Sequence, residues 1–376
     1  MIPMVNRGFK ILLLGATGYT GGLIAELFLE RGIDFWAYGR NLQKLEELKL
    51  SNKHCVGIEI FTIGSGGLLP QLSPRSIVVN CIGPFNVYGQ AVVEDCLTAG
   101  ATYIDITGEQ EIVKVSFDNN TKKALEIGAL IVHSMSFESA LSDLLLLLSM
   151  KALGANNYQS FNTYYLLNTK QMSPGTRISL KVANAFDSYS LWRGDLLDPA
   201  AMPSTKNQDA IKPYKAYRLG FPEPIFAKAH GSIAAADAYF LLDPMDPMGL
   251  FFSSKANLIN KSMDVSEIIE RHNRTNVEGP SKKERLLQSF EIHTHLTAET
   301  TGIKQILRGF NMYGLTAELV VLAVLKVLDE GSNNMPSNVS AGVLTPGQFL
   351  SNQGIEWLQQ HPQLQITTEL FNRNSI

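Results

Sequence analysis

The chain has 376 residues, of which 45% are hydrophobic and 18% are charged, and its formal net charge is −3. This length exceeds what one hydrophobic core usually organises, and the composition is typical of a folded globular protein, so we expect two domains. The slightly negative charge provides no electrostatic attraction for nucleic acids or anionic membranes. We therefore expect no nucleic-acid partner.

Cysteines and apolar runs indicate the environment in which the protein works. Cys55, Cys81 and Cys96 cannot all pair, and their spacing fits no metal site, so we expect no metal and a cytoplasmic location. The first ten residues lack the apolar core of a signal peptide. The most apolar stretch, Leu141–Met150, is too short to span a bilayer and predicts a buried helix. A peripheral membrane contact stays open.

The first 135 residues alternate strand-like and helix-like segments, an order typical of a parallel sheet with crossover helices. Strands are expected over Lys10–Leu14, Phe35–Tyr38, Cys55–Ile60, Ser76–Cys81, Tyr103–Ile106 and Ala129–His133. The helices between them are expected to end at Arg31, to cover Leu42–Leu50 and Val87–Thr98, and to end at Gly128. Six strands in this order predict a doubly wound parallel sheet of the α/β class.

Beyond residue 136 the pattern changes to that of an α+β domain with a mixed or antiparallel sheet. Strands are expected over Gln159–Leu167, Phe290–Thr300 and Ile303–Leu307. Helices are expected over Leu141–Leu153, Thr176–Phe186, Ile233–Leu242 and Leu315–Leu328, and a last one from Thr345–Pro346. Loops are expected over Trp192–Phe226 and Asp243–Gly249. The predicted division is a doubly wound domain over 1–135, an α+β substrate or dimerisation domain over 136–310, and C-terminal helices over 311–376 that pack back toward the first domain.

The most informative segment is ILLLGATGYTG, residues 11–21. Gly15 allows a sharp turn off the first strand, Gly18 allows backbone N–H groups to approach a pyrophosphate, and Gly21 allows the following helix to pack closely. The residues predicted to bind a dinucleotide here are Gly15, Ala16, Thr17, Gly18, Tyr19, Thr20 and Gly21. Because the spacing is G-x-x-G-x-x-G, a tight turn without a ligand is the alternative.

Two further strand ends complete the predicted cofactor site. The second strand ends in Arg40 with no acidic residue at its tip, which favours the 2′-phosphate of NADP over the ribose hydroxyl of NAD. The alternative is that Arg40 only precedes the next helix. The fourth strand leads into a segment expected beneath the nicotinamide half, formed by Cys81, Ile82, Gly83 and Pro84. Cys81 is interpreted as a small packed residue, because no histidine partner is recognisable near it.

The segments GATGYTGG, YGRNLQKL and, above all, Asn80–Glu109 closely resemble the saccharopine dehydrogenase-like oxidoreductase family, the group with the trans-acting enoyl reductases. Weaker similarity continues through EGPSKKER, TAELVV and GVLTPGQFL. The resemblance implies a Rossmann domain followed by an α/β domain around a mixed sheet. Where the family usually shows a GFDSxPSD-like segment, this chain has Ser136–Asp143, and a GDPGY-like segment is replaced by Gly309–Gly314.

Candidate proton carriers follow the fourth and fifth strands. Tyr88, Asp105 and Glu109 are the predicted catalytic residues, Tyr88 as a proton donor and the two acids as relays or ribose ligands. The alternative is structural: Asp105 and Thr107 organise the YIDITGE turn, and Tyr88 packs on its helix. His133, at the end of the sixth strand, is a further candidate for proton transfer.

Two other patterns favour structural roles. His293 and His295 alternate along a strand and therefore share one face, where solvent exposure is expected rather than metal binding. The segment Ser173–Thr176 opens a helix, either as a plain cap or as a site for an anionic group.

The sequence thus predicts an NAD(P)H-dependent oxidoreductase, with NADPH favoured, that forms a homodimer. The resemblance suggests a small-molecule substrate with an enoyl bond in an acyl chain or a saccharopine-like amine. The apolar runs Leu145–Leu148, Ile233–Phe240 and Phe251–Phe252 favour the acyl chain. The alternative is a non-catalytic NADP-binding protein that docks a partner or a membrane surface.

Overall fold

The computed structural model describes residues 6, 8–63, 67–169, 171–183, 186–201, 211–246, 264–273, 278–331 and 340–373. The chain divides into two compact units, each built from segments that are far apart in the sequence. The first unit consists of Met1–Thr107, Ile112–Phe137 and Tyr313–Leu350. The second consists of Gly108–Glu111, Glu138–Met312 and Ser351–Ile376.

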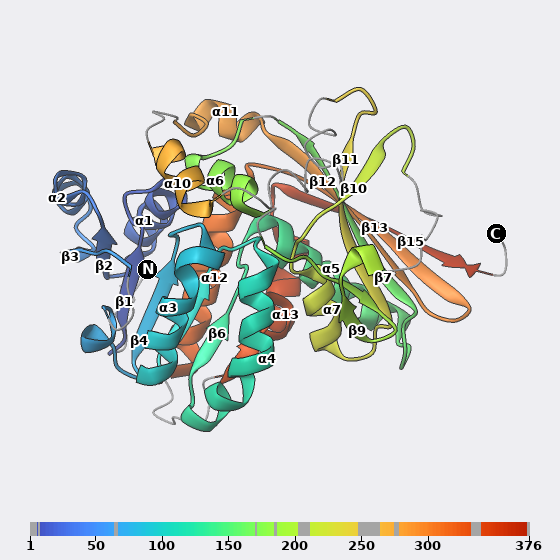
Figure 1. The fold of residues 1–376 in the computed structure, drawn as a ribbon, viewed down its shortest axis with the longest axis horizontal. Coiled ribbons are helices and arrows are strands. Elements are labelled where there is room, and N and C mark those ends of the chain that lie inside the picture. Colours follow the sequence, from blue (N-terminus) through green and yellow to red (C-terminus); the bar gives the residue numbers. More distant parts are fainter. Residues whose placement is uncertain are drawn as a thin grey trace. The chain divides into compact units, whose positions relative to one another are not determined.

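The first unit is organised around a parallel sheet, in which the described strands have the order β14-β6-β5-β4-β1-β2-β3 (Figure 1). The strands are β1 (Lys10–Leu14), β2 (Phe35–Gly39), β3 (Cys55–Ile60), β4 (Ser76–Asn80), β5 (Thr102–Asp105), β6 (Leu130–Val132) and β14 (Gly342–Leu344). The six strands predicted from the sequence are confirmed, and β14 is an addition that the sequence analysis missed.

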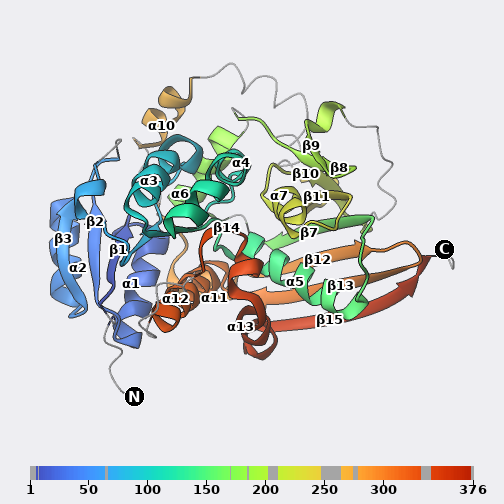
Figure 2. The ribbon, with the colours of Figure 1, turned by 90° about the horizontal axis from the view of Figure 1, so that it is seen from below.

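Helices cover both faces of this sheet, with α3 and α4 on one face and α1 and α12 on the other (Figure 2). The helical elements are α1 (Tyr19–Arg31), α2 (Leu42–Ser51), the short η1 (Leu69–Gln71), α3 (Phe85–Ala99), α4 (Gln110–Ile127) and α12 (Met312–Glu330). Because β1 and β4 lie in the middle, side chains on both of their faces are buried, as in the all-apolar run Leu12–Leu14.

The second unit contains a mixed sheet with the strand order β15-β13-β12-β7-β11-β8-β9, and β10 pairs with β11. Its strands are β7 (Ser160–Asn168), β8 (Ser190–Trp192), β9 (Asp195–Leu197), β10 (Lys215–Arg218), β11 (Ala235–Leu242), β12 (Ser289–Thr297), β13 (Thr301–Phe310) and β15 (Leu364–Asn372). Only β7 and β11 run parallel among these pairs of described strands. The predicted fold class, a doubly wound parallel sheet plus an α+β domain with a mixed sheet, is confirmed.

The remaining helices lie mostly in the second unit. They are α5 (Phe137–Leu153), α6 (Pro174–Ala183), η2 (Pro199–Ala201), α7 (Glu223–His230), α10 (Val265–Asn273), α11 (Lys282–Leu287) and α13 (Pro346–Gln360). As predicted, Thr345 caps α13: its hydroxyl accepts the N–H of Gln348 at 3.0 Å. The helix is interrupted at Ser351, where φ is 51°.

Three predictions for the second half of the chain are wrong. The helix predicted over Ile233–Leu242 is the strand β11, because pairing with β7, β8 and β10 on two sides outweighs the helix propensity of its alanines. The loop predicted over Trp192–Phe226 contains β9 and β10 and the start of α7. In the region 311–376, predicted as C-terminal helices, α12 and α13 are helical, but β14 and β15 are strands, and β15 pairs with residues 301–309 of β13. Parts of three predictions, residues 184–185, 202–210 and 247–249, lie outside the described residues, as does Phe251–Phe252.

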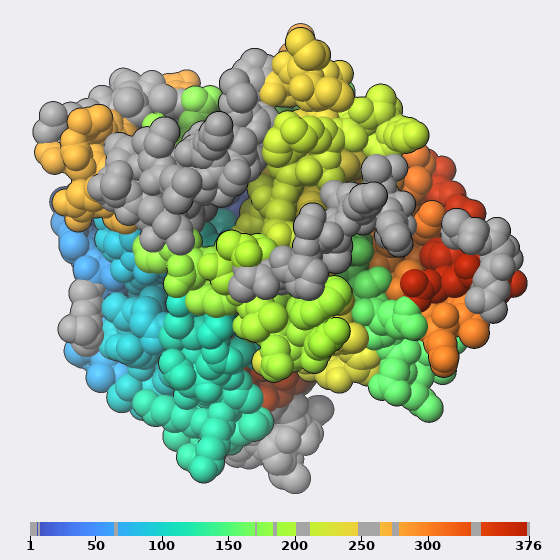
Figure 3. Space-filling model, turned by 45° about the vertical axis from the view of Figure 1, so that its right-hand side comes forward, coloured from blue at the N-terminus to red at the C-terminus, as the bar shows by residue number. Residues whose placement is uncertain are grey.

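One face of the second sheet packs against α5 and α7. Leu146 of α5 and Ala227 of α7 join Phe161, Ala236 and Leu296 of the strands in one buried apolar cluster. At the edge of the sheet, β13 and β15 lie side by side, visible as orange and red atoms in Figure 3.

Within the described residues we find no helix that has both the length and the apolarity needed to cross a membrane.

Candidate dinucleotide site

The glycine-rich turn follows β1, as the sequence predicts. Gly15 has a φ of +77°, a conformation that L side chains rarely adopt, and its N–H donates to the carbonyl of Tyr38 at 2.9 Å. A Cβ at Gly15 would lie 3.3 Å from the carbonyl oxygen of Cys81. The turns that follow β1 and β4 are therefore in contact at the carboxyl edge of the sheet.

The turn leads directly into α1, whose N-cap is Gly18. Gly18 is exposed and lacks a side chain that could accept the first N–H groups of the helix. A Cβ at Gly21 would lie 2.2 Å from the carbonyl oxygen of Gly15, so only glycine allows this close packing of helix and turn. A backbone cradle of this shape at a helix N-terminus fits the pyrophosphate of a dinucleotide.

Arg40 directly follows β2, on the same edge of the sheet. Its side chain is exposed, and no residue in the described part of the chain forms an ion pair with it. The neighbouring Asn41 caps α2, since its side-chain oxygen accepts the N–H of Lys44 at 3.0 Å. The guanidinium of Arg40 is thus available to an anionic ligand.

After β4 the chain forms a rigid turn. The side-chain oxygen of Asn80 accepts the N–H of Ile82 at 3.0 Å, and the peptide bond between Gly83 and Pro84 is cis. Burial and the negative charge of Asp105 raise the pKa of the Cys81 thiol. A thiol that stays protonated fits the packing role predicted for Cys81 rather than that of a nucleophile.

Behind these turns lies a buried hydrogen-bond network of five side chains from β4, β5, α4 and the end of β6. The Tyr103 hydroxyl donates to Oδ2 of Asp105 at 2.9 Å and accepts from the amide of Asn80 at 3.1 Å. Nδ1 of His133 contacts the same carboxylate oxygen at 2.7 Å, and its Nε2 contacts the Ser116 hydroxyl at 2.8 Å. Burial and the charge of Asp105 raise the pKa of Tyr103, which keeps its hydroxyl a donor. All five side chains are fully buried.

Asp105 also fixes the backbone of the turns after β5 and β6. Its Oδ1 accepts the N–H of Thr107 at 3.1 Å and that of Ser134 at 2.8 Å. Ser134 has a φ of 61°, which is unusual for a residue with a side chain and is held by this hydrogen bond. Together with Asn80, the network therefore holds the turns after β4, β5 and β6, all on the carboxyl edge of the sheet.

The structure places the predicted catalytic residues in different settings. Tyr88 is half-buried in the first turn of α3, where its N–H donates to the carbonyl of Pro84 at 3.0 Å. Asp105 is fully buried, and both of its oxygens receive hydrogen bonds. Glu109 belongs to the second unit, where its carboxylate accepts from the Ser179 hydroxyl at 2.7 Å. His133, a candidate for proton transfer, is fully buried and part of the network.

The second unit contains the two histidines and the helix start for which the sequence favoured structural roles. His293 and His295 lie on β12 of the mixed sheet, but the expectation that they face solvent is wrong: both are buried, and His293 contacts Glu291 at 2.7 Å. Ser173 is a plain cap of α6, because its hydroxyl accepts the N–H of Thr176 at 3.1 Å. Among the described residues, no three His, Cys, Asp or Glu side chains are arranged to hold a metal.

The altered segment Ser136–Asp143 contributes to a second buried polar cluster, which no motif revealed. Asp143 contacts Nε2 of His230 at 2.7 Å, and both side chains are buried. Although burial opposes the charged ring, the charge of Asp143 raises the pKa of His230. Nearby in the same cluster, the Tyr165 hydroxyl donates to Glu223 at 2.5 Å. Burial raises the pKa of Glu223 to about 7, despite the hydrogen bond from Tyr165.

We expect Glu223→Gln to remove a pH dependence of stability. Above its ordinary pKa of 4.5 the unfolded chain has an ionised Glu223, whereas the folded protein keeps the proton up to about pH 7. The free energy of unfolding therefore falls as pH rises between these values. Relative to the natural chain, the variant should gain stability across this window, by about 3 kcal/mol at most. Urea unfolding at pH 4 and pH 8 measures the gain, with the exposed Glu369→Gln as control. An equal change in the free energy of unfolding at pH 4 and pH 8 would contradict the raised pKa of Glu223.

Comparison with known proteins extends these observations. No family model matches the chain. The chain is 31% identical over 157 residues to the saccharopine dehydrogenase-like oxidoreductase of Homo sapiens, and 35% identical over 148 residues to a putative trans-acting enoyl reductase of Mycobacterium tuberculosis. A lipid droplet localized protein of Caenorhabditis elegans is 26% identical over 148 residues. The matches cover 37%, 37% and 36% of this chain and 37%, 34% and 35% of the relatives, so they span little more than a third of either.

Among solved structures, the apo form of saccharopine dehydrogenase (L-Glu forming) from Saccharomyces cerevisiae is similar, with a TM-score of 0.58. The alignment covers 96% of this chain and 100% of that one at 13% identity, a likeness that concerns the fold. The resemblance predicted from the sequence is thus confirmed: the chain is similar in sequence to saccharopine dehydrogenase-like oxidoreductases and trans-acting enoyl reductases, and it has the fold of saccharopine dehydrogenase.

Proposed function

We propose that the protein is an NADP(H)-dependent oxidoreductase whose cofactor binds at the carboxyl edge of the first sheet. The observation that carries this proposal is the turn after β1: Gly15 has a positive φ, Gly21 leaves no room for a Cβ, and α1 begins at Gly18, which has no side chain to cap it. This geometry fits the residues predicted to hold a dinucleotide, Gly15 to Gly21, with the turn Cys81–Pro84 beside them. When bound, the cofactor would supply a hydride.

The chain's own residues would position the cofactor and handle protons. Asp105 acts as a positioning residue, because both of its oxygens already hold neighbouring groups. Tyr88, close to the cis turn after β4, is the proposed proton donor, and Glu109 the proposed relay. The substrate is proposed to be a small molecule or an acyl chain, in view of the relatives named trans-acting enoyl reductase.

Preference for NADPH over NADH rests on Arg40, and we expect Arg40→Ala to remove it. An exposed guanidinium without an ion-pair partner can bind the 2′-phosphate, an interaction worth about 1 kcal/mol or more when charge-assisted. Isothermal titration with NADPH and NADH should show at least about a fivefold loss of NADPH affinity and little change for NADH. The control is Arg31→Ala, because Arg31 lies at the C-terminal end of α1, away from the glycine-rich turn. Equal losses for both nucleotides would contradict the assignment, and no binding of either to the natural chain would contradict the proposed function itself.

A non-catalytic role is the second candidate, favoured by the relative named a lipid droplet localized protein. In this case the first unit would bind NADP as a structural ligand and the protein would dock a lipid surface. Oxidation of bound NADPH by any acceptor would exclude this non-catalytic role.

A homodimer and a cytoplasmic location belong to the proposal as well. Size-exclusion chromatography with light scattering tests whether the protein is a dimer.

A further inference from the structure

The short helix α11 is attached to the rest of the second unit by its polar side chains, and it contacts β13 (Figure 1). A complete capping box fixes its first turn: the Ser281 hydroxyl accepts the N–H of Glu284 at 3.3 Å, and the Glu284 carboxylate accepts the N–H of Ser281 at 2.8 Å. The same carboxylate accepts from the amide of Gln171 at 2.8 Å. Nε of Arg285 donates to the side-chain oxygen of Asn311 at 2.9 Å. Glu284 and Arg285 therefore mark the side of α11 that faces the protein.

The other side of α11 has two lysines and two leucines. We call these four residues the α11 patch: Lys282, Lys283, Leu286 and Leu287. At about 100° of rotation per residue, they span an arc of about 140° that leaves out Glu284 and Arg285. Leu286 is 45% exposed, Leu287 is 69% exposed, and none of the six residues of α11 is buried. A surface helix usually turns its apolar side toward the core, so α11 has the reverse orientation and its leucines contribute to no core.

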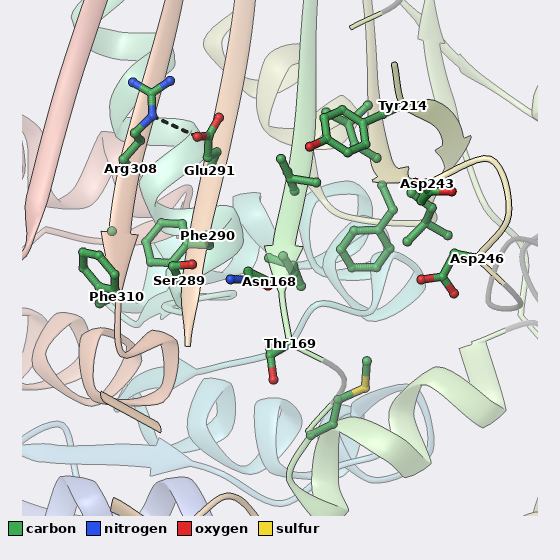
Figure 4. A pocket seen from close by; sticks show the side chains of 17 residues that line it. Asn168, Thr169, Tyr214, Asp243, Asp246, Ser289, Phe290, Glu291, Arg308 and Phe310 are labelled. Atoms are coloured by element: carbon green, nitrogen blue, oxygen red, sulfur yellow. Dashed lines mark hydrogen bonds and ion pairs between the residues drawn. The ribbon is translucent and has the colours of Figure 1, made fainter. Parts of the chain in front are cut away.

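A third exposed apolar side chain lies beside the α11 patch. Phe310 is the last residue of β13 and is 51% exposed (Figure 4). It pairs with Ser289 at the start of β12. The N–H of Asn311 donates to the carbonyl of Gln288, the residue directly after Leu287, at 3.0 Å. The end of α11 and the end of β13 are thus joined by a hydrogen bond, and their exposed apolar side chains are neighbours on the surface.

The two lysines give this apolar surface a positive charge. No ion pair joins Lys282 or Lys283 to a carboxylate in the described part of the chain. The net charge of −3 of the whole chain does not cancel this local charge, because salt at physiological strength screens charges beyond about 8 Å. Exposed leucines flanked by lysines fit the boundary between acyl chains and anionic headgroups, since the lysine stems can extend toward the headgroups.

The small size of this apolar surface favours a lipid surface over a second protein as the partner. Three partly exposed side chains offer a few hundred square ångströms at most, whereas a stable protein interface buries about 800 Å² on each partner. Peripheral contact with a membrane needs less area, because each basic residue near the surface adds attraction to anionic lipids.

We propose that the α11 patch, together with Phe310, docks the protein on an anionic lipid surface. Leu286, Leu287 and Phe310 enter the boundary between headgroups and acyl chains, and Lys282 and Lys283 lie at the headgroups. All five residues belong to the second unit, so the proposal does not rest on the proposed nucleotide site in the first. The contact is compatible with the oxidoreductase, and it supplies the surface that the non-catalytic candidate requires.

Co-sedimentation of the full chain with vesicles tests the proposal. The vesicles consist of phosphatidylcholine alone, which is neutral, or of phosphatidylcholine with phosphatidylserine, which is anionic. We expect at least about tenfold tighter binding to the anionic vesicles, and a loss of this preference at high salt. No binding, or equal binding to both kinds of vesicle, would overturn the proposal. Titration with NADPH needs no vesicles, so a failure of lipid binding is distinguishable from a failure of the proposed cofactor site.

One leucine variant locates the contact on α11. Leu287→Gln should weaken binding to anionic vesicles by about tenfold, because the leucine side chain leaves water on docking. Its thermal unfolding midpoint should stay close to that of the natural chain, since Leu287 packs in no core. The matched control is Leu50→Gln, because Leu50 is 88% exposed on α2. Equal losses in both variants would overturn the proposal.

A lysine pair tests the role of charge. Lys282→Gln combined with Lys283→Gln should remove the preference for anionic over neutral vesicles. Lys44→Gln combined with Lys49→Gln is the control, because these two exposed lysines lie on α2 in the first unit. An unchanged preference in the α11 variant would overturn the proposal. Sedimentation velocity tests the rival partner: self-association that Leu287→Gln abolishes, without vesicle binding, would mean that a second copy covers the α11 patch and would likewise overturn it.

Discussion

Gly21→Ala is expected to destabilise the first unit by about 3 kcal/mol and to abolish nucleotide binding. The added Cβ would lie 2.2 Å from the carbonyl oxygen of Gly15 and 2.9 Å from its carbonyl carbon. Both are backbone atoms, so the clash cannot be relieved by a side-chain rotation. Either α1 or the turn after β1 has to shift, and the backbone N–H groups that we propose to bind the pyrophosphate shift with it. Thermal unfolding and titration with NADPH measure the two effects.

The chain provides a matched control one residue further along the same helix. A Cβ at Gly22 would have no heavy atom within 4 Å. Gly22→Ala should therefore raise stability by up to about 1 kcal/mol, the usual gain for this change inside a helix, and leave NADPH binding intact. If both variants lose stability equally, the close packing of α1 on the turn does not explain why residue 21 is a glycine.

Asp105→Ala is expected to lower the free energy of unfolding by about 3–5 kcal/mol, as for other buried charged groups that lose a partner. The substitution leaves Tyr103 and His133 without their shared acceptor and frees the N–H groups of Thr107 and Ser134 inside the protein. Because these groups hold the turns at the carboxyl edge of the sheet, NADPH affinity should fall as well. Urea unfolding and nucleotide titration measure both.

Two further variants test whether Asp105 acts by holding its neighbours in place or through its charge. Asp118→Ala removes an exposed carboxylate that pairs with Lys114 on α4, and its effect should stay below about 0.5 kcal/mol. Asp105→Asn keeps an oxygen for the two backbone N–H groups, so it should retain more nucleotide affinity than Asp105→Ala. If Asp105→Asn binds NADPH normally but turnover is lost, Asp105 takes part in proton transfer. The assignment of Asp105 as a positioning residue is then wrong.

Local sequence patterns predicted the first sheet almost completely and the second sheet only in part. Strands such as Lys10–Leu14 are short apolar runs next to glycine turns, which is a strong local signal. By contrast, Ala235–Leu242 begins with the helix-favouring Ala-Ala-Asp-Ala and becomes a strand only because neighbours from distant parts of the chain pair with it. The three residues of β14 are too few for any periodicity to show.

The candidate site was predictable to the same extent. The roles proposed for Gly15, Gly21 and Arg40 can be inferred from the sequence, because each would act through its own backbone or charge. The partners of Asp105 could not be predicted, since Asn80, Ser116 and His133 come from three other elements and meet only in the folded unit. The same holds for the cluster of Asp143 and His230, whose residues are separated by 87 positions.

The pairing of β14 with β6 has a consequence for the order in which the protein can fold during synthesis. Gly342 aligns with Leu130, and the intervening chain includes most of the second unit. At roughly 5–20 residues per second, a ribosome needs on the order of ten seconds or more to deliver β14 after β6. Throughout that interval β6 is an unpaired sheet edge, a surface prone to pairing with other chains. The nascent protein is therefore expected to depend on chaperones most during synthesis of its second unit.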